Sequence, residues 1–125
     1  MKTYVTVSLA MLTGIAIGGF AVQSLQAQGK KAYTITENQV LDQKLAAAFA
    51  GRVSAAQTAA GGRNFNTGGG KITAMIGTAP ERVAITEWPS LEKAEAFFKS
   101  KAWTDLAPER DKALKTIRRY AVEER

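Results

Sequence analysis

The chain contains no cysteine and no histidine. Disulfide bonds, cysteine nucleophiles and zinc sites built from the usual ligands are therefore excluded. A Ser-His-Asp triad and axial haem ligation by His or Cys are excluded as well. We expect no metal site and no cofactor. Any catalysis by this chain depends on carboxylates, Lys, Arg, Tyr or backbone amides.

Charged residues are also absent from residues 5–22, which follow a short, weakly basic start at Lys2. Leu25-Gln26-Ala27 ends this apolar stretch with a small residue. That order is typical of a secretory signal peptide. We expect residues 1–27 to be a signal peptide cleaved after Ala27, and residues 28–125 to be the exported domain, in the periplasm or outside the cell.

The alternative is an uncleaved anchor. Residues 4–22 come close to the roughly 20 residues that a helix needs to span a bilayer. An uncleaved segment would tether the protein to the inner membrane, and only in that case do we expect a membrane contact. The lack of cysteine is compatible with export, because an oxidising compartment permits disulfides without requiring them.

The 125 residues suggest one domain, and their 17 basic and 11 acidic side chains give a formal net charge of +6. Charges of both signs alternate along the chain, as they do on a solvated surface. The excess of positive charge also fits a cavity or face that attracts acidic small molecules. We expect no nucleic-acid binding, because basic and aromatic residues do not cluster.

Alternation and helical periodicity define the first half of the domain. Residues 32–37 alternate with period two and predict a strand. Residues 43–60 predict an amphipathic helix, capped by Asp42 and ended by Gly61-Gly62. The apolar stripe expected on this helix comprises Leu41, Leu45, Phe49, Val53, Ala56 and Ala60.

The second half contains the clearest strand. Residues 63–67 and 71–76 predict two short strands around a glycine run, and residues 82–88 predict a longer one. Ser90 is expected to cap the next helix, and Pro108 to kink or restart a further helical segment. Residues 116–122 alternate as a closing strand.

The overall order, βαββα(α)β, is that of a split βαβ, ferredoxin-like α+β fold. It predicts an antiparallel sheet with helices on one face. Apolar side chains point both ways along the strands, and no second helical layer remains for the other face. A second copy of the chain that places its own sheet there would cover it. We therefore expect a homodimer.

Three motifs add a family resemblance. Residues 61–63 read Gly-Gly-Arg, residues 82–94 form a strand that ends in Glu-Trp-Pro-Ser, and residues 100–110 have a Ser-x-x-aromatic spacing before an Arg. Together they resemble the bacterial domain-of-unknown-function family 1330 over about residues 30–124. The resemblance implies a dimeric α/β barrel. Related barrels include cofactor-independent monooxygenases, lactone isomerases and haem proteins, and the missing histidine disfavours the haem branch.

Glu87 and Tyr33 are the candidate catalytic residues. Glu87 shares a strand face with Val83 and Ile85, so we expect it to be partly buried. The ferredoxin-like topology pairs the first and third strands antiparallel, which brings Tyr33 close to Glu87. Such a pair orients a proton donor in a pocket. The alternative is a structural hydrogen bond at a strand end.

Arg110, Arg63 and Trp103 are the candidate ligand-binding residues. The planar fork of Arg110 suits a substrate carboxylate, Arg63 is placed at the cavity rim, and Trp103 offers a surface for a flat apolar ligand. The alternatives for Arg110 are an ion pair with Glu87 or a surface ion pair with Glu109 or Asp111. The alternative for Arg63 is a backbone contact, and that for Trp103 is a position in the core or the dimer interface.

These residues predict a protein that binds or converts a small acidic or aromatic molecule in a cavity between sheet and helices. One alternative is a non-catalytic binding or stress-associated dimer. Another is a membrane-tethered interaction module that keeps residues 1–27.

Overall fold

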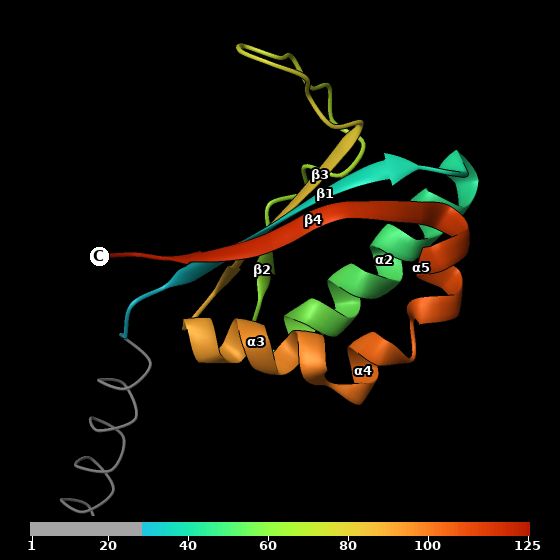
Figure 1. Ribbon diagram of the computed structural model, residues 1–125. Coiled ribbons are helices and arrows are strands. Elements are labelled where there is room, and N and C mark those ends of the chain that lie inside the picture. The colour runs from blue at the N-terminus through green and yellow to red at the C-terminus, as the bar shows by residue number, and fades with distance from the viewer. Residues whose placement is uncertain (1–28) are drawn as a thin grey trace, which may run out of the picture.

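The computed structural model describes residues 29–125, so the expected signal peptide lies outside the described residues. Residues 29–125 form four strands and four helices, labelled in Figure 1. They are β1 (Ala32–Val40), α2 (Gln43–Ala59), β2 (Arg63–Asn64), β3 (Arg82–Trp88), α3 (Leu91–Lys99), α4 (Lys101–Thr104), α5 (Ala107–Ala113) and β4 (Leu114–Glu123).

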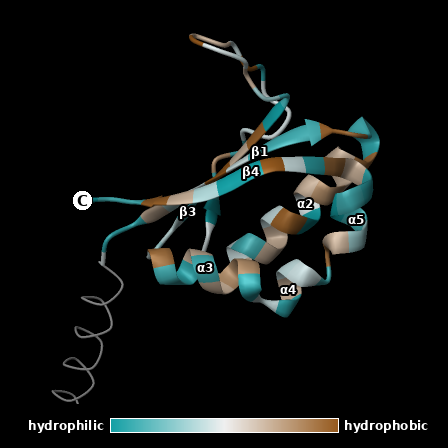
Figure 2. Ribbon diagram, viewed as in Figure 1, coloured by the Kyte–Doolittle hydropathy of each residue, from teal (hydrophilic) through white to brown (hydrophobic). Residues whose placement is uncertain are grey.

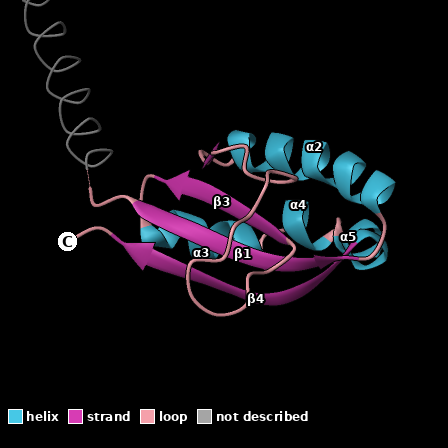
Figure 3. Cartoon of the chain, turned by 90° about the horizontal axis from the view of Figure 1, so that it is seen from above, coloured by secondary structure: helices cyan, strands magenta, loops and turns pink. Residues whose placement is uncertain are grey.

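The four strands form one antiparallel sheet in the order β2-β3-β1-β4. Figure 3 shows β1 lying between β3 and β4. In the β1–β3 register Tyr33 lies opposite Glu87, and in the β1–β4 register Ile35 lies opposite Tyr120. This order and the helical crossovers confirm the predicted α+β, ferredoxin-like split βαβ fold.

The helices cover one face of the sheet, and the segment between β2 and β3 rises on the other side (Figure 1). Successive side chains of a strand point to opposite faces. On β1 the side chains turned to the helices are buried, while those turned away are only partly buried. We call these the helix face and the open face of the sheet.

Side-chain caps define the starts of two helices as predicted. The Asp42 carboxylate accepts a hydrogen bond from the backbone N–H of Leu45 at 3.0 Å, and the Ser90 hydroxyl accepts one from Lys93 at 3.1 Å. These oxygens satisfy backbone donors that a helix start leaves without partners. Pro108 stands in the first turn of α5, where its missing N–H costs no hydrogen bond.

Two glycines end α2 for different reasons. Gly61 has a φ of +96°, which residues other than glycine rarely adopt. Gly62 is buried, and a Cβ there would lie 3.0 Å from the Trp88 ring and from Thr86. The first glycine turns the chain, and the second lets it pass close to β3.

Aromatic rings dominate the core between the sheet and α3 and α4. The Trp88 ring lies 5.2 Å from Phe97, which lies 5.8 Å from Trp103, and Phe49 of α2 lies 6.4 Å from Trp103. The Trp88 indole N–H donates to Thr34 Oγ1 at 3.0 Å, so its polar atom is satisfied at full burial.

Three sequence predictions are corrected by the structure. On α2 the helix buries Ala46, Phe49 and Gln57, while Leu45 is 43% exposed. The buried stripe is thus rotated by about one position from the predicted one, which places a glutamine inside.

The second correction concerns residues 71–76, which form no strand. They lie in the segment beyond the sheet, where no neighbouring strand offers hydrogen bonds. Met75 and Ile76 are 90% and 97% exposed, and the end of this segment is coloured as hydrophobic in Figure 2. Residues 63–67 also shorten to the two residues of β2, because Asn66 turns the chain with a φ of +59°.

Replacing Trp88 with Ala is expected to lower the free energy of unfolding by about 3–5 kcal/mol, because it removes the largest fully buried side chain and leaves a cavity. Met75→Ala is the control, and we expect a change below about 0.5 kcal/mol at this exposed position. Urea unfolding measures both. Similar losses in the two variants would contradict the assigned core.

Candidate functional site

The first candidate cluster lies on the open face of the sheet, at the end of β3. Glu87 lies opposite Tyr33 on β1 and opposite Arg63 on β2. The Arg63 guanidinium donates to the Glu87 carboxylate at 3.0 Å, and the Lys31 ammonium lies 3.4 Å from it. The structure therefore brings Tyr33, Glu87 and Arg63 together, as the sequence predicts for the first two.

The electrostatics of this cluster favour an ionised carboxylate. The hydrogen bond from Arg63 holds the pKa of Glu87 below its ordinary value, although burial opposes it, and Lys31 lowers it further. Burial raises the pKa of Tyr33, and the negative charges of Glu124 and Glu87 add to this effect. At neutral pH Glu87 is thus a paired anion and Tyr33 a neutral phenol.

Aromatic contacts complete the open-face cluster. The Tyr33 and Phe65 rings stack with centroids 6.3 Å apart, and the Arg63 guanidinium lies 4.5 Å from the Phe65 ring centroid. Phe65 thus contacts both Tyr33 and Arg63, the two side chains that lie beside Glu87, and the four residues form one connected cluster. This arrangement suits a structural role or an interface.

Arg110 and Trp103 lie elsewhere, on the helix side of the sheet. Arg110 of α5 donates to Asp111 at 3.2 Å, and its guanidinium lies 5.1 Å from the Trp103 ring centroid. Trp103 of α4 is buried in the aromatic core. The five predicted site residues thus divide into two groups on opposite faces of the sheet, and Arg110 does not reach Glu87.

A cavity of about 260 Å³ opens between α2 and the helix face of the sheet. Small residues of α2 make room for it, since Ala46, Ala50 and Gly51 all line it. Its lining also includes Trp103, which is the one predicted site residue that reaches it. The cavity is also lined by Thr36, Asn38, Gln57, Asn64, Phe98 and Arg119.

The polar residues around this cavity hold one another in place. Gln57 Oε1 accepts hydrogen bonds from the Asn64 amide at 3.2 Å and from Thr86 at 3.3 Å. The Asn38 amide oxygen accepts one from Thr116 at 3.0 Å. Buried polar groups need such partners, and a fully partnered set is rigid. The cavity wall is thus preformed and partly polar.

Arg119 of β4 lies at the aromatic end of the cavity. Its guanidinium carbon is 4.6 Å from the ring centroids of both Phe98 and Trp103, and its Nε donates to Thr36 Oγ1 at 3.0 Å. Burial lowers the pKa of Arg119 to about 10, and the positive charge of Arg110 contributes less. The side chain remains a cation at neutral pH.

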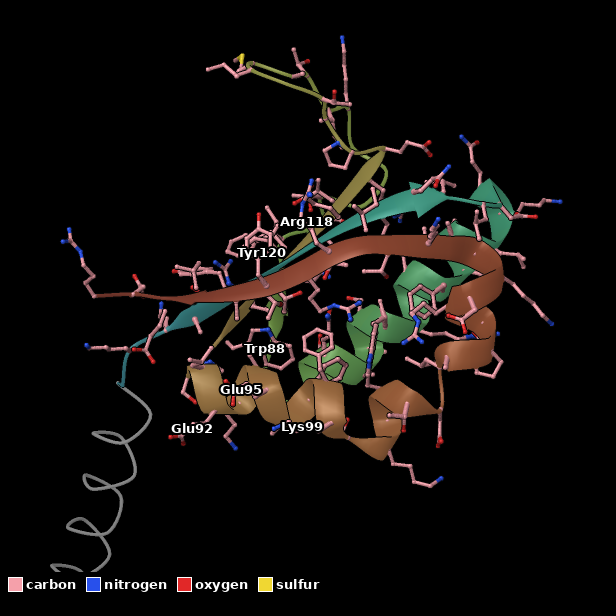
Figure 4. The ribbon with its side chains drawn as sticks, viewed as in Figure 1. Trp88, Glu92, Glu95, Lys99, Arg118 and Tyr120 are labelled. Carbon is pink, nitrogen blue, oxygen red and sulfur yellow. The ribbon has the colours of Figure 1, made fainter. Side chains whose placement is uncertain are left out.

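Sequence reasoning missed Arg119, Gln57 and Asn38. For Arg119 a signal was present, because consecutive residues of a strand face opposite sides. In the pair Arg118-Arg119, one guanidinium must therefore enter the helix side. Arg118 takes the open face, where it pairs with Glu37 at 2.7 Å (Figure 4). Gln57 was hidden by the small rotation of the buried stripe of α2.

A model of one protein family matches residues 31–124. The chain belongs to the DUF1330 family. Members of this family share a domain of unknown function, so membership identifies the domain without an activity. The match spans nearly all of the residues that the structure describes and confirms the resemblance found in the motifs. No curated protein matches the sequence.

Solved structures support the DUF1330 domain's fold. A crystal structure of RPA0582, a protein of unknown function from Rhodopseudomonas palustris, superposes with a TM-score of 0.60 at 13% identity, covering 83% of this chain and 92% of that one. A crystal structure of the methylated RPA0582 protein gives 0.59 at 13% identity, with 83% and 90% covered. At this identity the similarity establishes the fold alone.

Residues 29–125 contain neither a cluster of metal-ligating side chains nor a helix that could span a membrane. In this part of the DUF1330 chain no group of three or more Asp or Glu residues is arranged to hold a metal ion. No helix within the same residues is long and apolar enough to cross a membrane.

The pairing of Glu87 predicts a loss of stability in acid. A carboxyl whose pKa is lowered by folding contributes stability above its unfolded value, about 4.3, and loses that contribution as the pH falls through the folded value. Glu87→Gln is expected to reduce the fall in thermal stability below about pH 4.3. The control is Glu95→Gln, on the exposed side of α3, which should keep the wild-type fall. Equal pH profiles for the wild type and Glu87→Gln would refute the assignment.

Proposed function

We propose that this protein is an exported homodimer that binds a small acidic or aromatic molecule in the cavity between α2 and the sheet. The observation that carries the proposal is the cavity itself, about 260 Å³ within a small domain. Ligand sites combine apolar walls with a few convergent polar groups. Here the apolar walls come from Phe49, Val53 and Phe98. The polar groups come from Asn64 and Arg119.

The size of the cavity supports a small ligand. Pockets for drug-sized molecules measure about 300–1,000 Å³, so a volume just below this range suits a compact molecule. Natural cores are close-packed, so packing alone does not require a hollow of this size beside the core. The chain nevertheless places alanine and glycine along α2 opposite the sheet, where larger residues would fill the space.

The state of Glu87 favours binding over acid–base catalysis. Proton transfer near neutral pH works best with a group whose pKa lies near the operating pH. Arg63 and Lys31 instead hold the pKa of Glu87 low, and burial raises that of Tyr33. Both groups also lie on the open face, on the opposite side of the sheet from the cavity. We therefore assign the cavity to binding.

The open face supports the homodimer. Ile85, Ile35 and Tyr120 lie in one row across β3, β1 and β4, and Tyr33 and Val122 lie in the next. Tyr120 is 49% exposed and Val122 is 53% exposed, and Tyr120 points away from the helices in Figure 4. Ion pairs of Glu37 and Glu87 border these rows. An apolar centre with a charged rim is the usual anatomy of an interface, and two such sheets would form the barrel.

The dimer is tested by placing a charge at the centre of this face. Tyr120→Glu is expected to yield a folded monomer, because a second copy would bury the new carboxylate without a partner. Ala96→Glu, on the exposed side of α3, adds the same charge and should remain dimeric. Sedimentation equilibrium reports the mass. A monomeric wild type, or a dimeric Tyr120→Glu variant, would contradict the proposed interface.

The ligand and the export are tested together by native mass spectrometry of protein purified from the envelope fraction of the source cell. We expect a dimer whose chains begin at Gln28, with an additional bound small mass on each. Chains that retain residues 1–27 would support the anchor and contradict cleavage.

A matched pair of variants assigns the bound mass to the cavity. Ala50→Leu projects a larger side chain from a lining position and is expected to lose most of the bound mass. Ala47→Leu makes the same change on the exposed side of α2 and should retain it. Equal retention in both variants would place the ligand elsewhere.

A further inference from the structure

Arg119 carries its charge without an acidic partner, unlike four other arginines of the described residues. Arg52, Arg63, Arg110 and Arg118 each form an ion pair with an Asp or Glu. Among residues 29–125, no carboxylate forms an ion pair with Arg119. Its Nε donates to the neutral hydroxyl of Thr36. The chain thus keeps a partly buried cation whose charge no side chain of the described domain neutralises.

The two aromatic rings beside Arg119 hold its guanidinium in one orientation. Phe98 and Trp103 lie 5.0 Å apart, edge to face, and the guanidinium carbon is 4.6 Å from each ring centroid. Because Nε is used by Thr36, the paired Nη groups at the end of the side chain are left for another acceptor. A guanidinium fixed in this way loses little rotamer freedom when it binds.

We propose that Arg119 anchors the carboxylate of the cavity's ligand, which is a small carboxylic acid with a compact apolar body. This inference rests on the proposed function and names its ligand class. The two Nη groups accept the carboxylate as a bidentate pair. The body of the acid lies along Ala46, Phe49 and Val53, and the amide of Asn64 lies among the cavity's other polar groups.

The lining favours a carboxylate over a phosphate. Phosphate sites gather several donors, often at a helix N-terminus or in a glycine-rich loop. Here aromatic rings flank Arg119, and the second cation of the cavity, Arg82, packs against Gly68. Arg110 lines a separate groove, which Arg119 also borders. One planar fork between rings matches one planar carboxylate on an apolar body.

Calorimetric titration with benzoate tests the assignment on the purified dimer, with benzamide as the neutral molecule of the same shape. We expect benzoate to bind at least about tenfold more tightly than benzamide, because charge-assisted bidentate bonds are about twice as strong as neutral ones. Arg119→Met should lose about tenfold or more in benzoate affinity and clearly less in benzamide affinity, because benzamide has no charge to pair with the guanidinium. Arg119→Lys keeps the positive charge but lacks the planar guanidinium, so its benzoate affinity should lie between those of the wild type and Arg119→Met.

Arg125→Met is the control, because it removes the same charge at an exposed position of the chain end and should bind benzoate like the wild type. Thermal unfolding verifies that each variant is folded, and Arg119→Lys carries the test if Arg119→Met is not. Equal affinity for benzoate and benzamide, or unchanged benzoate affinity in both Arg119 variants, would overturn the anchor. Competition by inorganic phosphate as strong as that by benzoate would overturn the carboxylate class.

The same titration on Ala50→Leu separates this inference from the proposed function. If Ala50→Leu weakens benzoate binding while the Arg119 variants do not, the cavity binds small molecules and the anchor is wrong. If neither substitution affects benzoate binding and Ala50→Leu retains the native bound mass, the cavity proposal fails as well.

Discussion

The hydrogen bond from the Trp88 indole to Thr34 lies at the point on which the rest of the domain depends. It joins β3 to β1 beneath the sheet, and the same ring packs on Phe97 of α3 at 5.2 Å. The passage from α2 to β2 crosses this ring so closely that Gly62 leaves no space for a Cβ. The Trp88 side chain thus links β1 to β3, packs against α3 and limits the space available where the chain leaves α2. An indole suits this position because it combines a large apolar surface with one donor.

The position of this aromatic core determines where the cavity lies. Trp88, Phe97 and Trp103 fill the space beneath the sheet on the side of α3 and α4. The part of α2 with Ala46, Ala50 and Gly51 faces the remaining part of the sheet, where short side chains leave the gap. The rigid aromatic packing prevents this gap from closing by collapse. The aromatic core beneath one part of the sheet and the cavity beneath the other are therefore two consequences of the same side-chain packing.

Patterns of alternation and capping were enough to predict the fold from the sequence. The strands, the caps at Asp42 and Ser90 and the restart near Pro108 depend on interactions within a few residues, which a sequence displays directly. The strand predicted at residues 71–76 is absent because strand formation depends on a partner that is distant in the sequence. A strand exists only where a neighbour offers hydrogen bonds, and this apolar segment lies beyond the edge of the sheet. Similarly, the sequence places Tyr33 beside Glu87, because register follows from topology. It does not reveal that Arg63 neutralises the carboxylate, which depends on a two-residue strand.

Charge is treated in opposite ways on the two faces of the sheet, and this contrast is the strongest argument for a ligand. On the open face Glu37 pairs with Arg118 and Glu87 with Arg63, so that the border of the apolar rows is neutralised within the chain. On the helix face the removal of the Arg119 cation from water costs free energy, which the Phe98 and Trp103 rings offset in part and which an anion would offset further. Two aromatic rings and the Thr36 hydroxyl hold Arg119, but no carboxylate among the described residues pairs with its charge, and the cavity beside it leaves room for an anion that would do so.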